Sequence, residues 1–158
     1  MKIVKLIYDK WENEPIEYNE YGFNLQKSLP PKLGFEDVSY DGDYDMNRKL
    51  KIYSWGLKKN VSDIKVDIIF DLTVFQTKLD PSIDIPSING LSNEIMISII
   101  NHPKFFQLLG TIVTMIETEN ASKVAFVCNH GKHRSVGWAE LIGKYIYPKG
   151  LIRHKLLE

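Results

Sequence analysis

The sequence predicts a single α/β domain, with a mainly parallel sheet and helices on its faces. The chain has 158 residues and 44% hydrophobic content, which suffices for one sizeable core and is too little for two ordinary domains. Short β-branched runs alternate with segments of helical periodicity, and one run is apolar enough to be buried on both faces. This alternation is typical of a parallel sheet covered by helices.

Four segments have the length and β-branched content of strands. They cover residues 2–8 (KIVKLIY), 49–56 (KLKIYSWG), 66–75 (VDIIFDLTVF) and 122–128 (SKVAFVC). Residues 12–34 are polar and broken by prolines and glycines, so we expect mostly loop there. Alternating Asp residues at 41–45 are similar to the start of a calcium loop. Because Met46 and Ile52 stand where that loop requires Gly and Glu, we interpret the stretch as a turn.

Helical periodicity runs from Leu91 to about Glu119, and Pro103 divides it into a short helix and a longer one. Pro103 suits the first turn of the longer helix, and Asn120 suits its end. The residues expected on the core-facing stripe of this helix are Phe106, Leu109, Val113 and Ile116.

The last predicted helix covers residues 135–147 and is stopped by Pro148 and Gly150. It directly follows the strand at 122–128, so a strand–loop–helix unit closes the fold. The residues expected on its buried face are Trp138, Leu141, Ile142 and Tyr145.

The charge balance excludes a whole-molecule electrostatic field. Lys plus Arg and Asp plus Glu number 20 each, so neither nucleic acid nor an acidic membrane is attracted by net charge. The N-terminus becomes charged too soon for a signal peptide, and no apolar run approaches 18 residues, so we expect a soluble cytoplasmic protein and no membrane partner. One cysteine permits no internal disulfide. The abundance of Lys, Ile and Asn suits a bacterium or a phage.

A cluster of polar and charged residues occupies "VCNHGKHRSV", residues 127–136, between the last predicted strand and the last helix. In a parallel sheet, ligands bind outside the carboxyl ends of the strands, where this stretch lies. Gly131 permits a sharp turn, the helix N-terminus offers amide groups to an anion, and Arg134 adds a fixed donor fork. The candidate ligand-binding residues are Cys128, Asn129, His130, Gly131, Lys132, His133, Arg134 and Ser135.

Two of these residues have simpler interpretations. Ser135 suits the cap of the following helix, and we favour that role for its hydroxyl. Lys132 fits a solvated surface position as well as it fits the anion loop.

The same stretch also has the C-x5-R-S spacing of cysteine-dependent phosphatases, with Cys128 as nucleophile and Arg134 as phosphate ligand. Those enzymes usually carry His before the Cys, where this chain has Val127, and no aspartic general acid is evident. A buried, unreactive cysteine at the end of a strand is the alternative. We therefore expect a binding protein rather than an enzyme, with phosphatase activity as the alternative.

Cofactor and metal chemistry are disfavoured. Cys128, His130 and His133 match no usual zinc spacing and lack a fourth ligand, and the neighbouring Lys132 and Arg134 repel a cation. The stretch is no nucleotide-binding P-loop either, because the first Gly of that motif is missing and His133 replaces its Ser or Thr. We expect neither a metal nor a cofactor.

Asp71 ends the buried strand at 66–75, in "IIFDLT". In a parallel sheet its carboxylate would share an edge with Cys128 and accept hydrogen bonds from a sugar hydroxyl or an amine beside the phosphate. The alternative is a helix cap or a turn cap. Asp71 therefore completes the set of candidate ligand-binding residues.

Together these residues resemble the C-terminal domain of the RapZ family. The family's G-C-T-G-G-x-H-R-S-V stretch is similar to residues 127–136. Its S-F-G-x-K stretch and F-D-V-R-F strand are similar to "YSWGLKKNVSDIKVDIIFDLTVF", its L-T-G-x-D segment to "SINGLSNEI", and its closing R-H-R-x-L to "IRHKLLE". The matches run from about residue 50 to 156 in the family's order, so we expect a phosphate-ligand-binding domain over 50–158.

The resemblance implies a module that senses an amino-sugar phosphate, glucosamine-6-phosphate in the family. It does not extend to residues 1–49, which carry no nucleotide signature and which we expect to pack on the same domain. Thr73 replaces the family's Arg, and Asn129 and His130 replace its Thr and Gly. Asn89 and Ser92 also differ from the Thr and Asp of the family. Phosphate binding survives these departures, whereas amino-sugar specificity does not follow from them.

Three functions therefore remain open. The favoured one is a sensor or sequestering protein for an amino-sugar phosphate or a nucleotide. The second is the phosphatase, and the third is an RNA or protein adaptor. RNA binding has weak support, because the basic tail contains only Arg153, His154 and Lys155. A second copy of the chain is a further candidate partner, but the sequence does not indicate how many copies would assemble.

Overall fold

The computed structural model describes residues 1–6, 33–57, 64–73, 75, 90–129 and 133–155. In chain order its elements are β1 (Lys2–Lys5), the 3₁₀ turn η3 (Phe35–Asp37), β2 (Lys51–Gly56), β3 (Ile68–Asp71), α1 (Asn93–Ile100), α2 (Phe105–Thr118), β4 (Lys123–Cys128), α3 (Arg134–Leu141), the π-helical turn η5 (Ile142–Ile146) and β5 (Leu151–His154).

Within the described residues, the strands form one five-stranded sheet in the order β1-β3-β4-β2-β5. All four neighbouring pairs are parallel, and β4 lies at the centre between β3 and β2. The predicted α/β class with a parallel sheet is therefore confirmed. Because the strands are parallel, their carboxyl ends meet at one edge, where Asp71, Gly56 and Cys128 lie.

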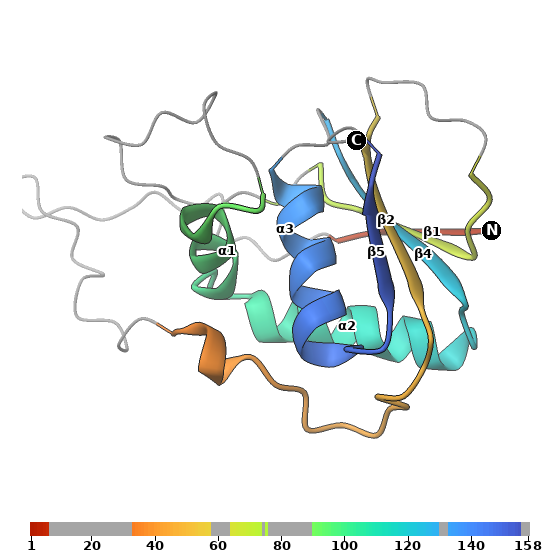
Figure 1. Ribbon diagram of the computed structural model, residues 1–158, viewed down its shortest axis with the longest axis horizontal. Helices are drawn as coiled ribbons and strands as arrows, with labels where there is room; N and C mark the ends of the chain where they lie inside the picture. Colours follow the sequence, from red (N-terminus) through yellow and green to blue (C-terminus); the bar gives the residue numbers. More distant parts are fainter. Residues whose placement is uncertain (7–32, 58–63, 74, 76–89, 130–132, 156–158) are drawn as a thin grey trace, which may run out of the picture.

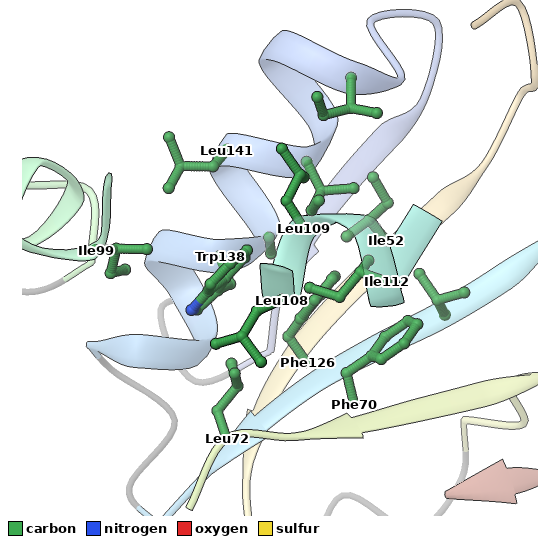
Figure 2. Close-up of a cluster of buried hydrophobic side chains, with 14 of the residues drawn as sticks. Ile52, Phe70, Leu72, Ile99, Leu108, Leu109, Ile112, Phe126, Trp138 and Leu141 are labelled. Atoms are coloured by element: carbon green, nitrogen blue, oxygen red, sulfur yellow. The ribbon is translucent and has the colours of Figure 1, made fainter. Parts of the chain in front are cut away.

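The three described helices cover one face of this sheet (Figure 1). Side chains alternate along each strand, so Ile52, Phe70 and Phe126 point into the helical layer, where Trp138 and Leu109 lie among the core residues of Figure 2. The opposite face carries a smaller cluster of Trp55, Val66, Ala125 and Val127. The expectation of helices on both faces is thus met on one face within the described part of the chain.

Helix α2 follows the predicted range with a shifted start. Leu109, Val113 and Ile116 are buried as expected, but Phe106 is 46% exposed and Phe105 is in the core. The prediction for Phe106 was wrong because Pro103 precedes the cap residue Lys104 and lies outside the first turn, so the buried stripe begins at Phe105. After this helix Asn120 adopts a positive φ of 50°, as a helix-ending residue does.

Two strand predictions need correction. The predicted strand 66–75 ends at Asp71, because the carbonyl groups that follow bond to a side chain of α3 instead of a neighbouring strand. Strand β5 was not predicted, and it pairs with β2 along four residues. The predicted strand 2–8 ends at Lys5, and residues 7–8 lie outside the described range, as does nearly all of the predicted loop at 12–34.

A polar cluster fixes the segment before β2 to helix α2. The Arg48 guanidinium donates through Nε and Nη2 to the two oxygens of Glu117, at 2.9 and 3.1 Å. The amide of Asp45 and the hydroxyl of Tyr147 also donate to Glu117. Burial opposes ionisation of this carboxyl, but the three donors together hold the pKa of Glu117 below its ordinary value. Glu117 therefore serves as a charged anchor.

In the described ranges, none of the helices combines the length and the apolar character needed to cross a bilayer.

Candidate functional site

The candidate site is the junction between β4 and α3. Strand β4 ends at Cys128 and α3 begins at Arg134. Three of the predicted ligand-binding residues, His130, Gly131 and Lys132, lie outside the described residues, and their roles stay predictions. A metal site formed by Cys128, His130 and His133 would also need His130, so that alternative stays a hypothesis. The described members are Cys128, Asn129, His133, Arg134 and Ser135.

Cys128 points into the helical layer and is 2% exposed. Its Sγ lies 3.3 Å from Oγ of Ser135, and its carbonyl accepts the amide of Leu57 at 2.9 Å. The first turn of α3 therefore lies directly over the thiol. A hydroxyl at this distance can donate to a thiolate or accept from a thiol.

Ser135 is not the helix cap that we predicted. The cap position belongs to His133, which makes no side-chain cap hydrogen bond, and Ser135 is the second residue of α3. The helix starts before Ser135, so the Ser135 side chain is fully buried and its hydroxyl contacts Cys128. The first amide groups of a helix have no acceptor within the helix itself, the feature that makes a helix N-terminus attractive to anions.

Arg134 braces the chain segment that follows β3. Its Nη1 donates to the carbonyl oxygens of Leu72, Thr73 and Phe75, at 3.2, 2.9 and 2.9 Å. Within the described part of the chain, all hydrogen bonds of the Arg134 side chain use Nη1. The edge formed by Nε and Nη2 is the one with which arginine grips a carboxylate or phosphate through two parallel bonds. The side chain can thus be positioned by Nη1 and bind through its other edge.

The braced segment is also held by its aromatic side chain. The Phe75 ring stacks on His102, with centroids 4.5 Å apart, and meets Trp138 of α3 edge to face at 5.6 Å. Burial, with a smaller contribution from Lys104, lowers the pKa of His102 to about 4, so the ring is neutral at pH 7. We did not single out Phe75 from the sequence, where only its place at the end of an apolar run was visible.

Asp71 lies on the predicted edge but on the other side of the sheet. Its register partner is Val127, one residue before Cys128, so alternation places the Asp71 and Cys128 side chains on opposite faces. Oδ1 of Asp71 accepts the amide of Thr73 at 2.8 Å, which confirms the turn-cap interpretation. A ligand that contacts both residues has to straddle the edge between β3 and β4.

Gly90 brings the start of α1 against the start of α3. A Cβ at this position would collide with the carbonyl oxygen of His133 and the amide nitrogen of Gly137. Only glycine permits this approach of two backbones. Helix α1 begins three residues later with Ser92 as cap residue, also without a side-chain cap hydrogen bond. The first turns of the two helices lie close together at this end of the molecule (Figure 1).

Fold and junction together define a class: a parallel α/β domain whose central strand leads through a short loop into a helix, at the edge where ligands bind in such sheets. A family model for the RapZ C-terminal domain matches residues 48–158, and the chain belongs to this family. The suspected resemblance is confirmed, and membership makes this a domain of a regulatory, ligand-binding family. A search of curated proteins finds no match.

Proposed function

We propose that the chain binds a phosphorylated small molecule at the β4–α3 junction, as a sensor or sequestering domain. The observation that carries this proposal is the placement of Arg134. Its Nη1 is fixed by three carbonyl groups, so the Nε and Nη2 edge is held in place at the start of α3. A donor that is already ordered loses little conformational entropy when a phosphate binds.

The local electrostatics favour an anion at the same place. The starts of α1 and α3 lie close together, and neither has a side-chain cap hydrogen bond. Each helix N-terminus carries a partial positive charge, and the charged Arg134 adds to both. Among the candidate ligands, an amino-sugar phosphate and a nucleotide both supply the dianion that this arrangement suits.

The contact between Cys128 and Ser135 favours one alternative, a cysteine-dependent phosphatase. A hydroxyl 3.3 Å from Sγ is placed to stabilise a thiolate nucleophile. Two observations weigh against turnover. Cys128 is buried, and Asp71, the register partner of Val127, lies on the opposite face and is engaged in a turn. Binding without hydrolysis is the better supported function.

An adaptor for RNA or protein has less support. The basic residue Arg153 lies in β5, an edge strand of the sheet, Lys155 follows this strand, and the net charge is zero. A nucleic-acid interface requires a concentrated basic surface. Self-association is compatible with any of these functions.

Cys128→Ser separates the binder from the phosphatase by turnover: a phosphatase keeps binding in this variant and loses turnover, whereas a binder shows no turnover in either protein. A binder uses the loop amides and Arg134, so we expect this variant to bind glucosamine-6-phosphate or a nucleotide within about tenfold of the wild-type affinity. Isothermal titration calorimetry of both proteins with each ligand measures the difference. Inorganic phosphate is the control that reports the anion site alone. If the wild-type protein bound none of the three ligands measurably, the proposal would be wrong.

A further inference from the structure

A buried polar relay connects β2, β5 and α3 on the helical side of the sheet. Oγ of Ser54 lies 2.6 Å from Nδ1 of His154, and Nε2 of His154 lies 3.0 Å from Oε1 of Glu140. The second carboxylate oxygen of Glu140 faces Lys144 at 3.5 Å. Ser54 is fully buried, and Glu140 is nearly so. None of these residues belongs to the candidate anion site.

The hydrogen bonds of the relay are compatible with one tautomer of His154. The hydrogen bond from His154, helped by the charge of Lys144 and opposed by burial, holds the pKa of Glu140 below its ordinary value. Glu140 is therefore a carboxylate at neutral pH and can accept a hydrogen bond from Nε2–H of His154. In the tautomer of His154 that carries its proton on Nε2, the other nitrogen, Nδ1, accepts a hydrogen bond from the hydroxyl of Ser54. Every member has a partner of the matching kind.

A hydroxyl, an imidazole and a carboxylate in this order are also the parts of a nucleophilic triad. Ser54 cannot serve as its nucleophile in this fold. Its side chain has 0% exposure, because β4 and β5 flank it in the sheet and α3 lies above it. Ser54 and Glu140 are buried and His154 is partly buried, which is costly compared with an apolar core, so we interpret these three groups as fixing the geometry of α3 over the sheet.

The hydrogen bonds among Ser54, His154 and Glu140 also bear on the candidate site. Ser54 lies two residues before Gly56, the register partner of Cys128, and it pairs with His154 in the sheet. Glu140 lies six residues after Arg134 on α3. A shift of α3 by one residue means a slide of about 1.5 Å and a rotation of about 100°, which would break the bond between Glu140 and His154. The relay therefore defines the register of α3 over the sheet.

We propose that Ser54, His154 and Glu140 are positioning residues, which hold the first turn of α3 over Cys128 and so set the environment of the thiol and of the anion site. The relay connects β2 and β5 to the middle of α3, and the helix transmits this constraint to its first turn. It touches neither the thiol nor the ligand. The part that concerns the ligand rests on the proposed function, and the part that concerns the thiol does not.

The test uses the single cysteine as a reporter, because the chain contains no other thiol. The rate of Cys128 alkylation by iodoacetamide is measured across pH for wild type, Glu140→Ala and His154→Asn. A buried thiol reacts through opening of the structure, so global destabilisation alone raises the rate. Ile146→Ala, in the buried face of η5 and outside the relay, is the control, compared at equal stability by urea titration.

We expect both relay variants to alkylate at least about fivefold faster than the control at equal stability, with a shifted pH profile, because α3 no longer holds Ser135 against the thiol. Glu140→Gln keeps an acceptor for His154 and should restore most of the wild-type rate. If either relay variant fails to fold, Ser54→Ala, which removes only the outermost bond, takes its place. Relay variants that alkylate at the control rate would overturn the inference.

A separate arm measures affinity for inorganic phosphate and glucosamine-6-phosphate. With the first turn of α3 displaced, we expect binding by Glu140→Ala to weaken about tenfold relative to Ile146→Ala. Wild-type protein that binds neither of these compounds nor a nucleotide contradicts the proposed function and leaves the thiol result valid. A changed thiol with unchanged affinity contradicts the ligand part of the inference.

Discussion

Arg134→Ala is expected to abolish binding of phosphorylated ligands, with a loss of at least about 100-fold in affinity, since charge-assisted bidentate bonds are among the strongest polar contacts. The same change should lower the free energy of unfolding by about 1–3 kcal/mol, because the carbonyl groups of Leu72, Thr73 and Phe75 lose their donor. Calorimetric titration and urea denaturation measure the two effects separately.

Arg134→Lys is the matched control for charge. Lysine keeps the positive charge but has no planar fork, so it cannot hold the segment after β3 and present two further parallel donors at once. We expect it to recover only part of the affinity. Equal affinity of Arg134→Ala and wild type would remove Arg134 from the site and with it the observation on which the proposal rests.

Gly90→Ala is expected to give the second large effect. The added Cβ would collide with backbone atoms of His133 and Gly137, which cannot move without displacing the first turn of α3. Overpacking of this kind costs about 1–3 kcal/mol or more, and the ligand affinity should fall with it. Thermal unfolding and phosphate titration of the variant measure both consequences.

Gly110→Ala is the matched control for this substitution. Gly110 lies inside α2, and among the described residues a Cβ there would meet the Tyr40 ring, at 3.8 Å, an ordinary contact. Alanine in a helix interior is favoured over glycine by about 1 kcal/mol, so this variant should be as stable as wild type or more stable. If Gly90→Ala behaved like Gly110→Ala, the close approach of α1 and α3 would play no part in the site.

Elements with a clear period were predictable from the sequence. The apolar runs of β3 and β4, the interruption at Pro103 and the position of the loop before α3 all follow from local patterns. Phe105 and Phe106 show the limit of this reasoning. Two adjacent phenylalanines lie about 100° apart on a helix, so the choice between them depends on where the helix starts.

The contacts that shape the site correspond to no local pattern in the sequence. Arg134 bonds to backbone carbonyls, and every residue type offers those, so the sequence gives no indication of its partners. Ser54 and Glu140 meet at His154 across separations of 100 and 14 residues. Strand β5 has only four residues, too few for a recognisable period. Such features depend on tertiary packing, which overrides local preference.

The most direct test of the central claim is a phosphorus NMR titration of the protein with glucosamine-6-phosphate, repeated with a mixture of nucleotides. Both the ester signal and inorganic phosphate are followed in the same tube. We predict a shifted or broadened ester line for at least one ligand class, and no growth of inorganic phosphate. Inorganic phosphate that accumulates beyond one equivalent would contradict the account, because Cys128 would then be a catalytic nucleophile in a phosphatase rather than part of a binding loop.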